Sequence, residues 1–488
     1  MQIVELNSNT SYWSLVIHQV SQTTAQVWLG TLFGTLRQPQ LARLLVKADG
    51  VEIQRVDLPQ QQWQRPISGL NQRFYQLIPL SGLTPGRAYQ LDFYQQLAGP
   101  GYDGQDQWQL LKQGYFSTLP ARLPGQQDKP FTLALASCFY QHQDAGRAAA
   151  AYKALYQQGG AMAPDIKLLL GDQVYLDIGL DSLSPLSREI RQRVAEDYAL
   201  NWQALGSMHS RGGSWMLPDD HEYWNDYPFY DSLLPTLFML KLSPVRQAWR
   251  QAALDAVRNI QQSQPFSTFN LGQDLAFCLV DVRSYRSQEG FVAPLVLQQL
   301  LDWLKQLTCP GVLVMSQVLL DTLSQTERNL RSFPAQYQAL VQALAVAPHD
   351  ILLLSGDVHF ARLAEVRLAG SGRRLLEIVS SPLSNLTGIN SLATATAAAQ
   401  PAWFPEQQCA GVTPQPVTYH LDYRVPVAAG QPCSSYWRDR TKEHFLTLSF
   451  QRQAKGVELR VQGWLVREQG ADGLPAAAFA QPFVTLLS

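Results

Sequence analysis

Residues 164–175, PDIKLLLGDQVY, are the stretch on which the predicted fold depends. Their short run at 166–170 (IKLLL), apolar except for Lys167, is typical of a strand that is buried on both faces of a sheet. Residues 131–138 (FTLALASC) predict a similar strand, and residues 145–160 (AGRAAAAYKALYQQGG) predict a helix that ends at two glycines. A strand, a helix and a second strand in this order predict a β-α-β unit with a parallel sheet.

The same pattern continues towards the C-terminus. Apolar runs at residues 274–285, 311–320 and 350–360 predict further buried strands, and residues 295–307 predict a helix before the second of them. Two longer segments, 181–214 and 232–263, are expected to be mainly helical insertions that cover the sheet. Residues 444–453 and 456–468 predict an antiparallel hairpin that turns at 454–456, whereas residues 388–440 receive no assignment.

The N-terminal part of the chain has a different pattern. Residues 12–119 alternate short strand-like runs with turns, and the segment 83–89 (LTPGRAY) is typical of the tyrosine corner of sandwich domains. An immunoglobulin- or fibronectin III-like sandwich is therefore expected, and any other small antiparallel domain remains the alternative. Residues 120–130 (PARLPGQQDKP) are rich in turn-forming residues. We expect domains at 1–119 and 131–488, with a linker at 120–130.

Composition excludes several classes of function. The chain has 488 residues, 46% hydrophobic and 16% charged, with a formal net charge of −1. This neutral balance gives no bulk attraction for nucleic acid or for an anionic membrane, and the apolar runs are too short to span a membrane. Five cysteines without a CxxC pair favour a reducing compartment. The first residues resemble no signal peptide and contain no twin arginine, so a cytoplasmic location is expected.

Polar side chains follow the predicted strands at the points where the strands end. Cys138 ends one run, Asp172 and Tyr175 follow another, and Asp357 and His359 follow a third. Because open α/β sheets bind ligands outside the carboxyl ends of their strands, these side chains are expected to converge. The D-x-H pair is expected to place both side chains on the same side of an extended segment.

A fourth group of polar residues lies in the stretch 217–226, LPDDHEYWND, which contains Asp219, Asp220, His221 and Glu222. Each motif alone has an ordinary structural interpretation: Asp172 as a helix cap, Cys138 as a small buried hydrophobe, DDHE as a solvated turn. Together, thiolate, phenolate, carboxylate and imidazole groups suit a dinuclear metal site.

These motifs resemble those of the calcineurin-like metallophosphoesterases, and more closely those of the alkaline phosphatase D (PhoD-like) family. The matching segments are Ser137-Cys138, 171–175 (GDQVY), 219–222 (DDHE) and 356–359 (GDVH). The resemblance extends to 281–286 (DVRSYR) and 381–383 (SPL). It implies an α/β fold: a four-layer α/β/β/α metallophosphatase domain preceded by the sandwich.

The resemblance also implies a set of ligands. Cys138, Asp172, Tyr175 and His359 would hold an iron-like ion, and Asp172 would bridge to a second ion held by Asp220 and Asp357. Fe(III) with Ca(II) is the implied pair, with zinc, manganese or magnesium as alternatives. Gln317 falls where the wider superfamily often has a ligating histidine, and Asp219 and Glu222 are expected to shape the loop or orient the ligands.

The activity implied by the resemblance is hydrolysis of a small-molecule phosphate ester, monoester or diester, by a metal-bound hydroxide. His221 would contact the substrate and protonate the leaving group. Arg283 is either a phosphate clamp or a structural arginine paired with Asp281 or another acid. A metallohydrolase of a non-phosphate ester or lactone, and a non-catalytic binding protein on the same fold, remain the alternatives. A serine hydrolase is disfavoured because no G-x-S-x-G motif occurs.

Overall fold

The computed structural model describes residues 10–100, 106–142, 144–179, 183–231, 235–323, 328–386, 400–406, 409–426 and 442–488. No helix within these ranges is long and apolar enough to cross a membrane. The four cysteines that fall in them, Cys138, Cys278, Cys309 and Cys409, are all free thiols. Most of the segment 388–440, which the sequence leaves unassigned, lies outside the described residues.

The first of two large sheets contains ten strands in the order β22-β21-β20-β8-β9-β10-β1-β2-β5, with β23 paired to β21. Their bounds are β1 Ser14–His18, β2 Ala25–Thr31, β5 Phe74–Leu80, β8 Phe131–Ala136, β9 Ile166–Leu170, β10 Gly213–Leu217, β20 His444–Gln453, β21 Gly456–Gln469, β22 Pro475–Ala477 and β23 Phe483–Leu487. β8, β9 and β10 run parallel. The predicted C-terminal hairpin is confirmed, since β20 and β21 pair in antiparallel register from His444–Leu465 to Gln453–Gly456.

The predicted β-α-β unit is confirmed as well. Helix α1 (Arg147–Gln158) connects β8 to β9, and it ends at Gly159, whose φ of 70° is a left-handed conformation that glycine adopts without steric cost. Every residue of β8 and β9 is buried. In β9, Leu168 and Leu170 pack between the two large sheets, whereas Leu169 packs on the helical side. The apolar residues of β9 are thus explained by burial on both faces, and the buried Lys167 donates to the carbonyls of Arg211 and Gly212.

The second large sheet contains nine strands in the order β11-β12-β13-β14-β16-β15-β18-β17, with β19 paired to β15. Their bounds are β11 Phe266–Leu271, β12 Leu275–Val280, β13 Gly311–Val314, β14 Ile351–Ser355, β15 Phe360–Arg367, β16 Arg374–Val379, β17 Trp403–Phe404, β18 Gln415–Tyr419 and β19 Val425–Pro426. β12, β13, β14 and β16 are parallel to one another. The three apolar runs expected to be buried strands are β12, β13 and β14.

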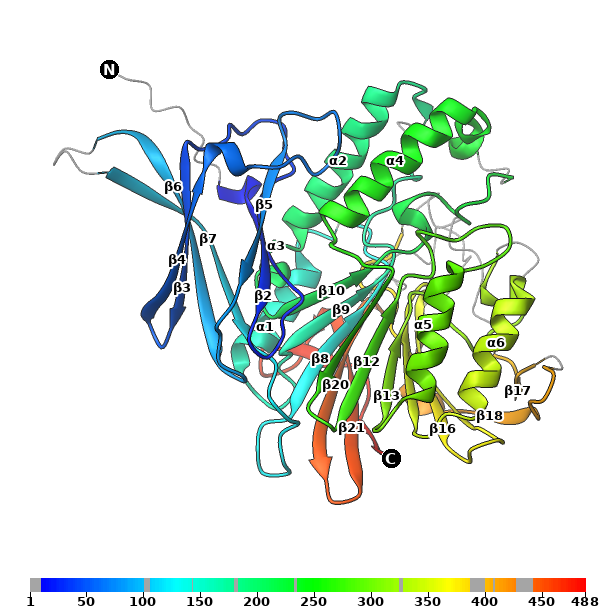
Figure 1. Ribbon diagram of the computed structural model, residues 1–488. Helices are drawn as coiled ribbons and strands as arrows, with labels where there is room; N and C mark the ends of the chain where they lie inside the picture. The colour runs from blue at the N-terminus through cyan, green and yellow to red at the C-terminus, as the bar shows by residue number, and fades with distance from the viewer. Residues whose placement is uncertain are drawn as a thin grey trace.

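Helices cover the outer face of each large sheet, and one core lies between the sheets. α2 (Ser187–Ala204) and α4 (Ser243–Asn259) pack with α1 on the first sheet, and both lie in segments expected to be helical. α5 (Pro294–Lys305) and α6 (Pro334–Ala345) pack on the second sheet. Figure 1 shows α2 and α4 at the top and α5 and α6 to the right of the paired sheets. These layers bring the carboxyl ends of the parallel strands together.

The N-terminal strands form two facing sheets. β1, β2 and β5 face a four-stranded sheet in the order β4-β3-β6-β7, with bounds β3 Leu41–Ala48, β4 Val51–Pro59, β6 Ala88–Pro100 and β7 Asp106–Ser117. The hydroxyl of Tyr89, at the start of β6, accepts a 2.7 Å hydrogen bond from the Thr84 N–H. This is the tyrosine-corner contact that the segment 83–89 predicts.

The N-terminal strands also continue the first large sheet. β1 pairs with β10 in parallel at His18 and Ser214, and the Gln19 N–H donates to the Ser214 carbonyl at 3.2 Å. One hydrophobic core runs from these strands into the space between the two large sheets. The division at 120–130 remains a prediction, with hydrogen-bonded strands on both sides of it.

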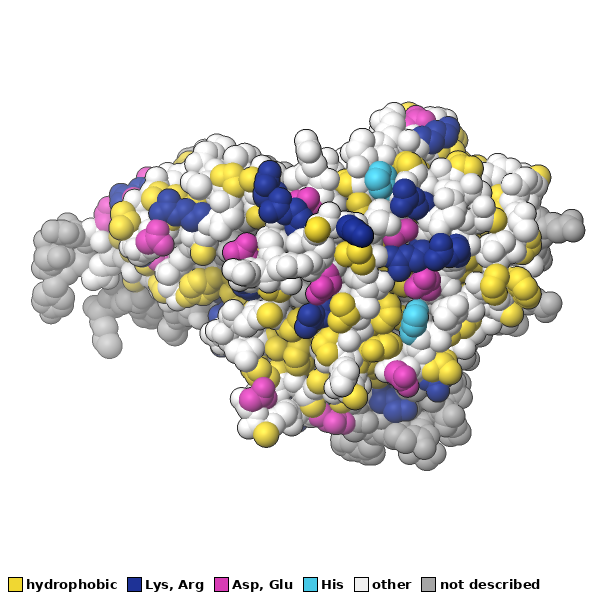
Figure 2. All heavy atoms as spheres, turned by 90° about the horizontal axis from the view of Figure 1, so that it is seen from below, with side chains coloured by type: hydrophobic (Ala, Val, Ile, Leu, Met, Phe, Trp, Pro, Cys, Tyr) yellow, Lys and Arg dark blue, Asp and Glu magenta, His cyan; other side chains and the backbone are white. Residues whose placement is uncertain are grey.

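The surface carries charges of both signs. Figure 2 shows Lys and Arg side chains interspersed with Asp and Glu on the face seen from below. On this face, neither sign forms a continuous field, in keeping with the formal net charge of −1.

Candidate metal centre

The predicted site residues follow the ends of parallel strands from both large sheets. Cys138 lies two residues after β8, and Asp172 lies two residues after β9. Asp220 follows β10 by three residues and opens a short 3₁₀ helix, Asp220–Glu222. Asp357 lies two residues after β14. Each side chain therefore emerges at the edge where ligands bind in sheets of this kind.

The structure brings these side chains together. Three overlapping groups have potential ligand atoms within 4.8 Å of one another: Cys138, Asp172 and His359; Asp172, Asp220 and His221; Asp219, Asp220 and Asp357. Asp172 links the first two groups and Asp220 links the last two. The Tyr175 hydroxyl lies 3.5 Å from His359 Nε2, so the sixth predicted ligand joins the first group. All of these residues are buried except Asp357, which is half-buried.

Four of the six predicted ligands have a strained backbone. Cys138, Asp172, Asp357 and His359 have φ values of 57°, 51°, 70° and 55°. A positive φ is uncommon for residues with a side chain, and its concentration in one place is typical of a functional site. The expectation of an extended segment at 357–359 is wrong, because both Asp357 and His359 are left-handed.

Two glycines allow the strand ends to approach one another closely. A Cβ atom on Gly171 would lie 2.5 Å from the Asp219 Cβ, and one on Gly356 would lie 2.4 Å from the Ser137 Cβ. Gly171 also has a φ of 87°. The G-D pairs are therefore required for packing as much as for turning, because any larger residue would separate the strand ends.

The two imidazoles are held in place by hydrogen bonds through Nδ1. His221 Nδ1 lies 2.7 Å from Asp177 Oδ1, and His359 Nδ1 lies 2.9 Å from Asn385 Oδ1. Each contact fixes the ring and leaves Nε2 for the centre, as is usual for a histidine that binds a metal or transfers a proton. Sequence reasoning missed Asp177 and Asn385. Asp177 lies only two residues beyond Tyr175, but its sequence position does not indicate its partner.

Glu222 fixes the loop that carries Asp219 and Asp220. Its carboxylate accepts hydrogen bonds from the N–H groups of Asp172, Gln173 and Asp219 at 2.8–2.9 Å, and from Gln261 Nε2 at 3.0 Å. Burial raises the pKa of Glu222 to about 7, against the effect of these donors. The contacts agree with the expected role in shaping the loop.

Arg283 lies beside the centre and is engaged by an acid. Its Nε donates to Asp219 Oδ1 at 2.5 Å, and Nη1 donates to the Tyr227 carbonyl at 3.0 Å. The side chain is only 2% exposed. Asp281 instead accepts from the backbone N–H groups of Arg283 and Ser284. The geometry matches the structural interpretation of this arginine, with Asp219 as the acid.

The neighbourhood strongly affects the protonation of these groups. Burial, together with nearby carboxylates, raises the pKa of Asp172 and of the Cys138 thiol well above their usual ranges, and burial raises that of Tyr175. Burial also acts against a charged His221, but Asp177, Asp220 and Asp172 together hold its pKa well above the usual value. These acidic groups can all be ionised in one buried space only if a cation lies among them.

The donor set fits metal ions on two further grounds. Asp219 Oδ2 is buried and has no hydrogen-bond partner among the described residues, and Asp219 belongs to the third group of potential ligands. Thiol, phenol and imidazole on one side suit a transition ion, and carboxylates on the other suit a hard divalent ion. Gln317, at the position where the wider superfamily often has a ligating histidine, is engaged by an arginine: its Oε1 accepts a hydrogen bond from Arg286.

Comparison with solved structures identifies the fold. A structure of PhoD aligns over 98% of this chain and 91% of its own, with a TM-score of 0.62 and 15% identity. The fibronectin III domain of human collagen alpha-1(XX) aligns over 24% of this chain and 88% of its own, at 17% identity, but its TM-score of 0.16 supports no argument. No protein-family model and no curated protein matches the sequence. The chain thus has a PhoD-like fold.

Proposed function

We propose that this chain, which has the PhoD-like fold, is a metal-dependent hydrolase of phosphate esters. One observation carries the proposal: six side chains with metal-binding chemistry converge at the carboxyl ends of strands from both sheets, beside an oriented histidine. Burial of ionisable groups and backbone strain at the same residues support it, because both lower the stability of the fold and are usually retained for function.

Cys138, Asp172, Tyr175 and His359 would hold one metal ion. Asp220 and Asp357 would hold a second, with Asp172 between them. Asp219 is an additional candidate for the second ion, since its Oδ2 has no partner within the described part of the chain. Fe(III) with Ca(II) matches the two donor sets, and zinc, manganese or magnesium are the alternatives. Bound ions of this kind polarise a phosphoryl oxygen and lower the pKa of bound water.

His221 would donate a proton from Nε2 to the leaving oxygen. Asp177, 2.7 Å from Nδ1, holds the ring in position and stabilises its charged form. Asp172 and Asp220 also favour the charged imidazole. A histidine with a raised pKa remains a proton donor at neutral pH, which suits a general acid.

Arg283 would act by holding Asp219 rather than by binding phosphate directly. Its guanidinium bridges Asp219 and the Tyr227 carbonyl, which lie at opposite ends of the loop 219–227. Because the buried arginine makes both hydrogen bonds, it fixes the shape of this loop and therefore the position of Asp220.

The first test is metal analysis of the purified protein by mass spectrometry. We expect about two metal ions per chain, and loss of at least one in Cys138→Ala and Asp172→Asn. Cys278→Ala is the matched control, because Cys278 is equally buried but lies on β12, in the core that α5 and α6 form with the second large sheet. A metal-free protein that is fully active would overturn the proposal.

The second half of the test is a substrate panel. The metal-loaded protein is assayed with p-nitrophenyl phosphate, bis(p-nitrophenyl) phosphate and p-nitrophenyl acetate. Turnover of either phosphate ester that is lost with the metal supports the proposal. Turnover of the acetate alone identifies a carboxylic-ester hydrolase, and turnover of none favours a binding protein on the same fold.

A further inference from the structure

A second site adjoins the loop 219–227 on the side that faces α4. It is a cavity of about 690 Å³, within the size range of small-molecule sites. Its lining includes four arginines and one acid: Arg246, Arg250, Arg286, Arg328 and Asp231. Four aromatic side chains also line it: Trp224, Tyr227, Phe229 and Tyr230.

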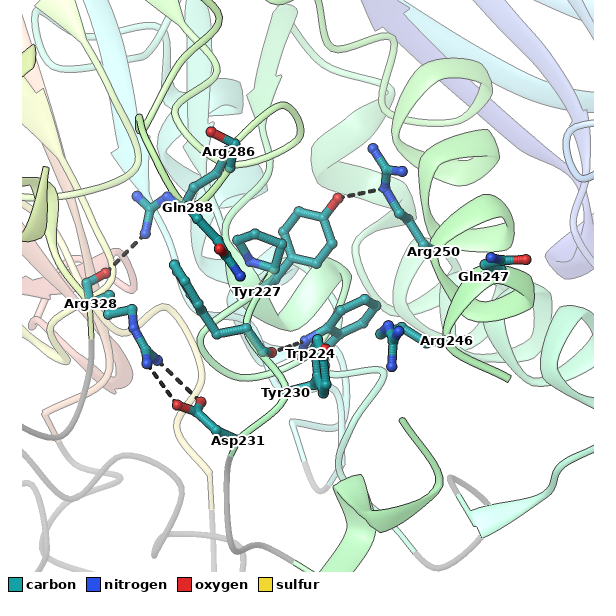
Figure 3. A pocket seen from close by; sticks show the side chains of 13 residues that line it. Trp224, Tyr227, Tyr230, Asp231, Arg246, Gln247, Arg250, Arg286, Gln288 and Arg328 are labelled. Atoms are coloured by element: carbon teal, nitrogen blue, oxygen red, sulfur yellow. Dashed lines mark hydrogen bonds and ion pairs between the residues drawn. The ribbon is translucent and has the colours of Figure 1, made fainter. Parts of the chain in front are cut away.

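The arginines surround the aromatic residues. Figure 3 shows Arg246 and Arg250 on one side of Trp224, Tyr227 and Tyr230, and Arg286 and Arg328 on the other. Arg246 and Arg250 are four residues apart on α4, so they lie on the same face of the helix. The cavity therefore receives positive charge from separate segments of the chain.

The charges of this cavity are unbalanced. Arg328 is neutralised, since it pairs with Asp226 at 2.5 Å and with Asp231 at 2.7 Å. The other three guanidinium groups donate only to neutral acceptors in the described part of the chain. Arg246 donates to the Leu240 carbonyl, and Arg250 donates to the Tyr227 hydroxyl at 2.9 Å.

Arg286 is the third of these groups, and it is 4% exposed. It donates to the carbonyls of Val282 and Arg328 and to the side chain of Gln317. Burial, with the nearby charge of Arg283, lowers the pKa of Arg286 to about 9, against the effect of the carboxylates of Asp219, Asp226 and Asp220. A bound anion would relieve this cost, because a buried cation is stabilised by a partner of opposite charge.

The aromatic walls favour a flat group beside the anion. Arg246 stacks over the Tyr230 ring at 4.0 Å, and Arg328 stacks over the Phe229 ring at 3.9 Å. Tyr230 is 43% exposed, which is unusual for so large a side chain. Guanidinium and aromatic planes together form a surface on which a ring can stack.

We propose that this cavity binds a ligand in which a phosphate or similar anionic group is attached to a planar ring, as in a nucleotide. Arg246 and Arg250, which lie on the same face of α4 and have no carboxylate partner in the described part of the chain, would bind the anion. Arg286 would add positive charge from the opposite wall, and Trp224, Tyr227 and Tyr230 would contact the ring. The inference depends on the cavity and its charges, and is therefore independent of the metal centre.

The experiment is isothermal titration calorimetry on the full chain in the presence of EDTA and low salt. The probes are AMP, which has a ring and an anion; adenosine, which has the ring alone; and inorganic phosphate, which has the anion alone. We expect AMP to bind at least tenfold more tightly than either of the others, and its affinity to fall as salt is added.

Two variants and a matched control test the residues. Arg250→Gln and Arg246→Gln are each expected to weaken AMP binding at least tenfold. Arg258→Gln is the control, because Arg258 is also exposed on α4 and also donates to a tyrosine hydroxyl, that of Tyr285, but does not line the cavity. Near-ultraviolet circular dichroism verifies that each variant is folded.

The proposal is overturned if AMP binds no better than adenosine and phosphate, or if both cavity variants bind it as the control does. Competition with bis(p-nitrophenyl) phosphate in the metal-loaded protein then distinguishes two sources of the ligand. If AMP inhibits competitively, the cavity binds a part of the substrate that lies away from the reacting phosphate. If AMP inhibits non-competitively or not at all, the cavity binds a separate ligand. Both outcomes presuppose that AMP binds in the calorimetry.

Discussion

His221 and Asp177 form a pair whose role depends on the leaving group. An alkoxide or phenolate of high pKa requires a proton as its bond to phosphorus breaks, whereas p-nitrophenolate does not. We expect His221→Asn to lower kcat/KM for phenyl phosphate esters by about 10²-fold or more, and to affect p-nitrophenyl esters much less. Asp177→Asn, which retains the ring, is expected to show an intermediate loss.

Metal content measured in the same variants separates two roles for this histidine. A ring nitrogen of His221 lies within 4.8 Å of a carboxylate oxygen of Asp172 and of one of Asp220. A general acid can be removed without loss of metal. If His221→Asn loses a metal ion, or if both classes of ester slow equally, the histidine is a ligand or a structural residue and the assigned role is wrong.

At the scale of single residues, the sequence predicted which side chains would meet but not what would hold them. Asp172 and Asp357 follow predicted strands, and the ends of parallel strands share an edge, so their convergence could be predicted. The strand β10, which precedes Asp220, was not predicted, and its first residues fall in a segment expected to be mainly helical. Asn385 contacts His359 across 26 residues of sequence, and no local pattern indicates that contact. The acid that engages Arg283 likewise comes from another strand end, 64 residues away.

At the scale of the elements, the candidate metal centre depends on the close packing of the strand ends. Substitution of Gly171 tests this dependence. A methyl group there would meet the Asp219 Cβ at 2.5 Å, in addition to the strain of a positive φ. Gly372 has a φ of 70° but nothing within 4 Å of the added atom. Gly372→Ala isolates the strain, for which we expect a loss of about 1 kcal/mol of unfolding free energy.

Gly171→Ala adds the steric clash, so the expected loss is about 2–4 kcal/mol in total. Urea denaturation of both variants gives the comparison. We also expect Gly171→Ala to lower metal content, because Asp219 and Asp172 would be displaced, whereas Gly372→Ala should bind metal normally. Equal losses of stability in the two variants would contradict the role of close packing.

Secondary structure was largely predictable where burial is uniform and local geometry is regular. The strands β8, β9, β12, β13 and β14, helix α1 and the terminal hairpin all follow from apolar runs, glycine endings and alternation. The segment 357–359 was not predictable. Its left-handed backbone is imposed by the surrounding strand ends, since no local preference of Asp or His requires it.

At the scale of the whole molecule, the N-terminal strands join the first sheet at His18. The protonation of this histidine is expected to change the stability of the folded chain. His18 is the last residue of β1 and is 1% exposed, beside Trp202. Burial, with the charge of Lys167, lowers its pKa from 6.5 to about 3 in the folded protein. Below pH 6.5 the unfolded chain therefore takes up a proton that the folded chain does not.

The stability that depends on neutral His18 is present above pH 6.5 and is lost as the pH falls towards about 3. Compared with His18→Asn, the wild type should lose up to ~1.4 kcal/mol of unfolding free energy per pH unit below 6.5. Urea denaturation at pH 8, 7, 6 and 5 measures the difference. The difference should change little between pH 8 and 7 and should grow from pH 7 to 5, and a constant difference at all four values would contradict the prediction.

The pairing of β1 with β10 has a consequence for any attempt to divide this chain. β1 pairs with β10 at His18 and Ser214, so a chain without the N-terminal strands would lose that pairing at the edge of β10 and would expose part of the core. Such an edge is a template on which strands of other molecules add. The N-terminal strands are thus expected to protect the first large sheet against self-association, and a shortened protein beginning at residue 131 is expected to aggregate rather than to fold as an independent unit.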